Sequence, residues 1–183
     1  MLQITFSSSE LYNDRTGQFF DIQGGTFSFE HSLLSVSKWE YKYCKPFLTD
    51  QPEYKKTTEE WLYYFKCMCT DSRFETALIT VKEQKQLLDY IALNQTATRL
   101  SPKKPDPSRS GSFISSELLY ANMANSQIPF TADRWPLSRL MALLGIISEQ
   151  NTDPKERKQS VQETREMQKH LNAERRAAMK SKG

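Results

Sequence analysis

The sequence predicts an α+β fold, in which short N-terminal antiparallel strands are followed by a mainly helical body and a basic C-terminal helix. Apolar and polar residues alternate over residues 1–34, which is the period of a half-buried strand. Helix-capping sequences replace this alternation from residue 57 onward. Residues 154–183 then combine strong helix formers with nine Lys or Arg against four Glu. The chain therefore changes from strand to helix near residue 57 and ends in a charged segment suited to water.

Two or three short antiparallel strands are expected at the N-terminus. Leu2, Ile4 and Phe6 alternate with polar neighbours, apolar residues follow again after residues 13–17, and the alternation returns at Phe27 and Phe29 after residues 23–25. Both of these intervening segments are rich in turn-forming residues, so we expect a turn at each. Because so small a sheet is marginal in water by itself, one of its faces needs a cover.

Residues 32–48 fit either a helix or a strand. Trp39 and Tyr43 lie four residues apart, as on one side of a helix, yet Trp39, Tyr41 and Tyr43 also share one face of a strand. Pro46 ends the element in either case. The sequence leaves the state of residues 32–44 open.

Capping boxes that begin at Thr57 and Thr80 predict helices over residues 58–69 and 80–94. In each box a Glu follows the Thr by three residues, so that both side chains satisfy free backbone N–H groups. Between these helices, residues 72–81 fit a short strand or a connector.

Two further helices are expected after residue 112. The first is short and covers residues 114–126, and the second contains the most apolar stretch of the chain, residues 135–147. Thr131 or Asp133 is expected to cap the second helix, with Pro136 in its first turn, where the missing N–H costs nothing. A helix that is apolar on nearly all sides is buried or forms an interface.

The chain therefore divides into four parts. These are residues 1–94 with strands and helices, a linker of Pro, Ser and basic residues at 95–112, an apolar helical hairpin at 113–152 that packs on the first part, and a basic helical tail at 153–183. We expect the tail to pack little on the rest. The residues expected to be mostly buried are Trp61, Phe65, Leu88, Ile91, Leu119 and Leu144.

The sequence has no pattern typical of a catalytic, metal or cofactor site. Cys67 and Cys69 are closer together than the cysteines of a zinc knuckle, and Cys44 and His31 are remote from them. Neither His31 nor His170 is placed to activate a cysteine, and no phosphate-binding glycine motif occurs. We therefore expect a protein that is not an enzyme and uses no cofactor or metal.

Compartment and partner class follow from composition. Three cysteines, an odd number, indicate reduced thiols in a cytosol-like compartment. No apolar run approaches the roughly 20 residues of a membrane span, and no signal peptide is expected. Residues 154–183 carry a net charge of +5 and the remainder carries −2, so a contact with nucleic acid through the linker and tail is an alternative function. No known nucleic-acid-binding motif supports it.

Two groups of residues carry a resemblance to a known family. The first group comprises residues 29–40, 45–48 and 57–60, and the second comprises residues 128–130, 135–140 and 173–177. Both are similar to stretches of small proteins encoded among the tail genes of long-tailed bacteriophages, which are often described as tail assembly chaperones. The linker departs from the family pattern, and Pro136 stands where that pattern has a His.

The resemblance implies a non-enzymatic phage tail morphogenesis protein in the host cytoplasm. Such chaperones hold tape-measure or tail-tube protein, and self-association is an additional expectation. The candidate partner-binding residues are Trp135, Leu137, Arg139, Leu140, Met141 and Leu144, with Trp39 and Phe47 as a second group and Arg175 and Arg176 in the tail. An ordinary core position is the alternative for the apolar members. The alternative functions are a nucleic-acid-binding accessory protein and a minor virion component.

Overall fold

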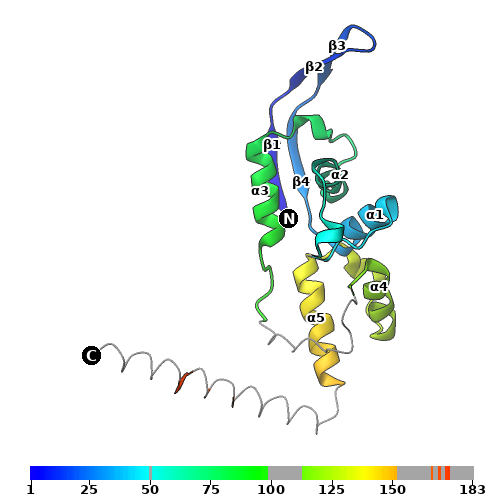
Figure 1. Cartoon of the computed structure of the whole chain (residues 1–183), viewed down its shortest axis with the longest axis vertical. Coiled ribbons are helices and arrows are strands. Elements are labelled where there is room, and N and C mark those ends of the chain that lie inside the picture. Colours follow the sequence, from blue (N-terminus) through cyan, green and yellow to red (C-terminus); the bar gives the residue numbers. More distant parts are fainter. Residues whose placement is uncertain (50, 99–112, 152–165, 167–168, 170–171, 174–183) are drawn as a thin grey trace, which may run out of the picture. The chain divides into compact units, whose positions relative to one another are not determined.

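The structure, a computed structural model, describes residues 1–49, 51–98 and 113–151, together with 166, 169, 172 and 173. Its elements are β1 (Leu2–Phe6), β2 (Ser9–Asn13), β3 (Gln18–Ile22), β4 (Gly25–Phe29), α1 (Leu33–Tyr43), η1 (Pro52–Tyr54), α2 (Thr58–Met68), η2 (Thr76–Leu78), α3 (Val81–Ala92), α4 (Ser116–Asn125), η4 (Phe130–Arg134) and α5 (Leu137–Gln150) (Figure 1). The predicted α+β class is confirmed, since short antiparallel strands precede the helices.

The chain forms two compact units, Met1–Leu144 and Gly145–Gly183. Of the second unit, the structure describes residues 145–151, which end α5, and the four isolated positions named above. The expected tail helix at 153–183 and most of the expected linker at 95–112 lie outside the described residues. The description below concerns the first unit.

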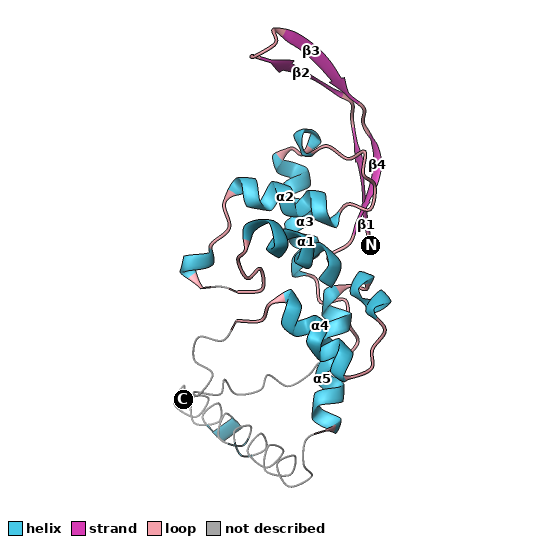
Figure 2. Ribbon diagram, turned by 90° about the vertical axis from the view of Figure 1, so that its right-hand side faces the viewer, coloured by secondary structure: helices cyan, strands magenta, loops and turns pink. Residues whose placement is uncertain are grey.

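The strands form two antiparallel ladders. In the first ladder β1 pairs with β4, from Leu2 opposite Phe29 to Phe6 opposite Gly25. In the second, β2 pairs with β3, and residues 14–17 form the turn that joins them. The second ladder continues from the first along the same two chain segments, so that the β2–β3 hairpin lies beyond the β1–β4 ladder (Figure 2).

The second turn expected at residues 23–25 is wrong. β3 and β4 pair with successive strands, β2 and then β1, so the chain does not reverse between them. Instead the two ladders are joined here by a close approach of backbones. The Gly24 N–H donates to Ser8 Oγ at 3.0 Å, and a Cβ atom on Gly24 would lie 2.3 Å from the carbonyl oxygen of Phe6. Residue 24 must therefore be glycine, because a side chain there would collide with the backbone of the neighbouring strand segment.

Side-chain caps start the helices. The capping boxes predicted at Thr57 and Thr80 are both present, at the starts of α2 and α3. Ser32 and Ser35 form a third box, which makes residues 33–43 a helix and resolves the ambiguity of residues 32–44. The sequence rule looks for Glu or Gln at the third position, so a Ser–Ser box is not detected by it.

Two other expectations are settled by the described residues. The segment at 72–81 is a connector that contains the short η2 helix, and no strand of the described residues lies within it. The apolar helix α5 begins at Leu137, after Pro136, so a cap at Thr131 or Asp133 is wrong. Those two residues lie in η4, a separate short helix that ends before Trp135.

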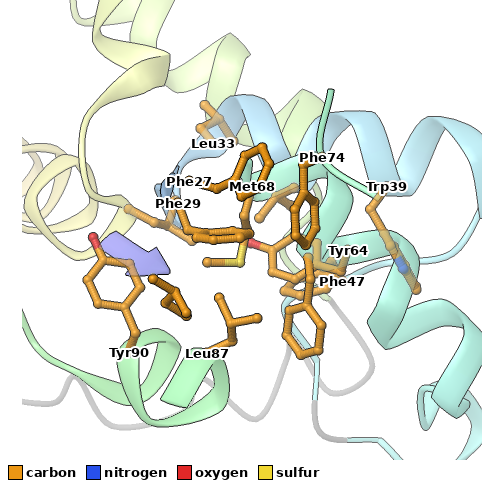
Figure 3. Packing of buried hydrophobic residues seen from close by; sticks show 14 of the residues in the cluster. Phe27, Phe29, Leu33, Trp39, Phe47, Tyr64, Met68, Phe74, Leu87 and Tyr90 are labelled. Atoms are coloured by element: carbon orange, nitrogen blue, oxygen red, sulfur yellow. The ribbon is translucent and has the colours of Figure 1, made fainter. Parts of the chain in front are cut away.

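The core lies between the β1–β4 ladder and the helices, and aromatic rings dominate it (Figure 3). Phe74, from the connector after α2, is fully buried. Its ring centroid lies 5.3, 5.2 and 5.1 Å from those of Phe6, Phe27 and Phe29. Since these rings come from both strands of the ladder, Phe74 closes the core over it.

The residues expected in the core are partly confirmed. Phe65 and Leu119 are buried. Trp61, Leu88, Ile91 and Leu144 are half-buried and pack against the core from its edge.

A buried carboxylate joins three segments of the helical body. Glu40 of α1 accepts the backbone N–H of Phe47 and that of Ser116, both at 2.7 Å. Ser116 is the first residue of α4, so this carboxylate also lies at the positive end of the α4 dipole. Glu40 therefore fixes the segment after α1 and the start of α4 to the same helix, and α4 packs on α1.

Candidate partner-binding surface

The β2–β3 hairpin, residues 9–22, exposes large aromatic side chains and is called the arm below. Tyr12, Phe19 and Phe20 are 53, 65 and 48 % exposed. Burying such a side chain contributes about 1.5–3 kcal/mol, and the arm forgoes much of that for each of the three. An exposed apolar patch of this kind typically marks an interaction site.

The two faces of the arm differ. Leu11 and Phe20 stand opposite one another and share a face with Ile22, which is buried in the core. The helices cover the apolar side of the β1–β4 ladder. The inner face of the arm continues this apolar side beyond the covered part.

The outer face carries the other cross-strand pairs. Tyr12 stands opposite Phe19, with ring centroids 4.9 Å apart. The next pair on this face, Glu10 and Asp21, places two exposed carboxylates directly opposite each other. The arm thus presents an apolar inner face and an acidic, aromatic outer face.

An open hollow of about 640 Å³ lies at the base of the arm. Leu11, Phe20 and Phe27 of the strands line one side of it, and Arg73 and Ala77 of the connector between α2 and α3 line the other. The strands of the arm each have only one strand partner among the described residues, so each also has a free edge. A free edge beside an apolar hollow suits an extended segment of another chain, which pairs through its backbone and inserts side chains.

Four of the partner-binding residues expected from the sequence are core residues, which corrects that expectation. Trp39, Phe47, Leu137 and Leu140 are buried, at 5 % exposure or less. Trp39 donates its indole N–H to the carbonyl oxygen of Glu60 at 2.9 Å, so even its polar atom is satisfied internally. Their burial favours the alternative that these positions are ordinary core residues.

The other expected residues lie nearer the surface or outside the described residues. Trp135 is 37 % exposed, and the guanidinium of Arg139 lies 4.8 Å from the centre of its ring. Met141 and Leu144 are half-buried at the edge of the core. Arg175 and Arg176 lie outside the described residues. The predicted set is therefore not one surface, although Trp135 and Arg139 come together.

The titratable groups near the core have the pKa shifts of buried structural residues. Burial lowers the pKa of His31 to about 4, although Glu30 beside it opposes the shift. Its Nδ1 lies 2.5 Å from the hydroxyl of Tyr64, which is fully buried. Burial also raises the pKa of the Cys67 and Cys69 thiols, whereas reactive cysteines have a lowered pKa.

Among the described residues, no cluster of three or more His, Cys, Asp or Glu could hold a metal ion. Within the same residues, no helix has both the length and the apolar character needed to span a bilayer.

Comparisons with known proteins identify no relative. Neither a family model, nor a curated protein, nor a solved structure matches the chain. The candidate site therefore depends on the geometry of this chain alone.

The sequence analysis did not select the arm, although one signal in the sequence pointed to it. Phe19 and Phe20 are adjacent in a strand, and adjacent strand residues point to opposite faces. A ribbon covered on one face only can bury just one of them. An adjacent pair of large aromatic residues in such a strand therefore predicts an exposed one.

Proposed function

We propose that this chain is a non-enzymatic binding protein whose arm holds a segment of another protein during assembly of a phage tail. The observation that carries the proposal is the exposure of Tyr12, Phe19 and Phe20 on a hairpin beyond the covered part of the ribbon. The resemblance to tail assembly chaperones supplies the partner class, which is tape-measure or tail-tube protein in the host cytoplasm.

The arm has the features that such holding requires. A tape-measure protein is a long chain with apolar stripes that must stay soluble until the tube forms around it. The inner face of the arm and the hollow below it offer an apolar strip next to a free strand edge. A small contact surface gives a modest binding affinity, and this suits a protein that must later release its partner.

A contact with nucleic acid gains no support from the arm. Residues 9–22 contain three acidic residues, Glu10, Asp14 and Asp21, and one basic residue, Arg15. Phosphate binding needs the opposite balance.

Co-purification tests the proposal. The full-length chain is co-expressed with the tape-measure or tail-tube protein of its phage, and Phe20→Ser is compared with Tyr41→Ser. Both side chains are exposed aromatics, but Tyr41 lies on α1, outside the arm. The native chain and Tyr41→Ser should retain the partner, whereas Phe20→Ser should lose most of it.

Three results would contradict the proposal. Equal retention by both variants would remove the arm from the contact. Detection of the chain in purified virions at a fixed copy number would make it a virion component instead of a chaperone. Retention of nucleic acid at low salt, with neither tail protein retained, would favour the accessory role.

A further inference from the structure

We propose that the outer face of the arm binds an arginine side chain of the partner protein, between the carboxylates of Glu10 and Asp21 and over the rings of Tyr12 and Phe19. This inference deepens the proposed function, because it takes the arm as the contact surface and names the chemistry of what binds there.

The first argument is the cross-strand carboxylate pair. Glu10 and Asp21 stand directly opposite one another and both are exposed. Like charges in this relation destabilise a hairpin. Among the described residues, neither carboxylate forms an ion pair or a side-chain hydrogen bond. A cation between the two groups would be attracted by both carboxylates.

The second argument is the aromatic pair on the same face. Tyr12 and Phe19 are two residues along their strands from Glu10 and Asp21, so all four side chains project from one side of the hairpin. Their rings lie 4.9 Å apart and are exposed. The face of an aromatic ring attracts a cation, and aromatic residues elsewhere in this chain already hold one. The Lys42 ammonium lies 3.7 Å from the Tyr63 ring centre, for example.

Arginine fits this combination better than lysine does. Its planar guanidinium carries five N–H donors, so it can bridge two carboxylates while its flat face lies on a ring. A lysine ammonium can also bridge two carboxylates, but it is more strongly hydrated and has no flat face to stack on a ring. The net acidic charge of residues 9–22 favours a basic partner segment over a nucleic acid.

The test is an NMR titration of the full-length chain, isotopically labelled, with a blocked peptide of alternating glycine and arginine. The matched probe is the same peptide with citrulline in place of arginine, which keeps the shape and removes the charge. The arginine peptide should shift the backbone amide signals of residues 9–12 and 19–22. The citrulline peptide should bind at least tenfold more weakly.

Variants locate the contact. Glu10→Gln combined with Asp21→Asn should weaken arginine-peptide binding at least tenfold, while the hairpin stays folded, because both replacements keep the size of the side chains. Asp14→Asn is the matched control, because Asp14 is an exposed acidic residue in the turn. It should change the affinity less than twofold. Circular dichroism checks that each variant retains the fold.

The inference is overturned if the two peptides bind equally, if the signals of the arm do not move, or if the double variant binds as the native chain does. Its failure is distinguishable from failure of the proposed function. If the double variant retains the tail protein while Phe20→Ser loses it, the arm still holds the partner and only the arginine contact is wrong. If the arginine peptide binds but neither tail protein is retained, the outer face of the arm does bind arginine and the proposed tail function is wrong.

Discussion

The two antiparallel ladders formed by the N-terminal strands differ in what is packed on them. In the β1–β4 ladder the apolar face, including Ile4, Phe27 and Phe29, is buried under the helices and the connector. In the β2–β3 ladder, which is the arm, Ile22 is buried, while Phe19 and Phe20 are exposed. Both ladders are antiparallel and carry large apolar side chains, so the layer packed on a ladder decides whether its side chains supply stability or surface.

This difference predicts a division of labour between stability and binding. Side chains of the covered ladder should determine the free energy of unfolding. Side chains of the arm should affect it little and affect binding strongly.

Replacing Phe74 with Ala should cause the greatest loss. Phe74 is fully buried and contacts three rings of the covered ladder. Truncating a buried Phe costs about 3–5 kcal/mol, since it removes buried area and leaves a cavity. Urea unfolding followed by circular dichroism measures it. A loss of less than about 1 kcal/mol would mean that the connector does not close the core over the ladder.

Acid should weaken the covered end of the ribbon through His31, which follows β4. Burial lowers the pKa of His31 to about 4 from its ordinary value of 6.5, so the fold favours the neutral ring. The corresponding stability is fully present above pH 6.5 and is lost as the pH falls from 6.5 towards 4. The loss is on the order of 3 kcal/mol.

The matched variant is His31→Gln, which has no titrating ring. Urea unfolding of both chains at pH 7 and near pH 4 gives two pH-dependent losses, and carboxylates elsewhere contribute equally to each. The native chain should lose more stability than the variant does. Equal losses would show that His31 is not held neutral by the fold.

The joint between the ladders should tolerate no side chain at residue 24. A Cβ on Gly24 would lie 2.3 Å from the Phe6 carbonyl oxygen and 2.5 Å from the backbone nitrogen of Ser8. Backbone must shift to admit it, so Gly24→Ala should cost about 1–3 kcal/mol. At Gly25 the nearest atom is 3.8 Å away, in the Phe27 ring. Gly25→Ala is therefore the control, and it should lie within about 0.5 kcal/mol of the native chain.

Amide hydrogen exchange shows where the damage at the joint lies. In Gly24→Ala, amides of the arm should lose protection more than those of the β1–β4 ladder, because the arm has no other layer to hold it. An equal loss of amide protection in both ladders would mean that the arm and the core unfold as one unit. The proposed difference between the two ladders would then be wrong.

Local chemistry made much of the fold predictable. Alternation located the strands, and the Thr–Glu pairs at Thr57 and Thr80 located the starts of two helices, because both signals act within a few residues. The ambiguity at residues 32–44 came from a cap made of Ser32 and Ser35, which lacks the usual acidic partner.

The candidate surface was less predictable because exposure depends on distant segments. Trp39, Phe47, Leu137 and Leu140 have the composition of a partner-binding surface, but they are buried in the core of the folded chain. The glycines at 24 and 25 have the composition of a turn, but the close approach to Phe6 is made by a strand remote in sequence. Pattern identifies apolar residues, whereas tertiary contacts decide which of them remain exposed.

The smallest effect on stability should come from Phe19→Ala, and it tests the comparison most sharply. Phe19 is 65 % exposed and its main contact is the Tyr12 ring across the ladder. Such a cross-strand pair contributes roughly 0.2–1 kcal/mol. The urea midpoint should therefore move little, whereas binding through the outer face should fall several-fold, because one ring of the proposed arginine site is gone. A stability loss near that of Phe74→Ala would mean that Phe19 is buried in the protein in solution. The arm would then serve the stability of the fold and not the binding of a partner.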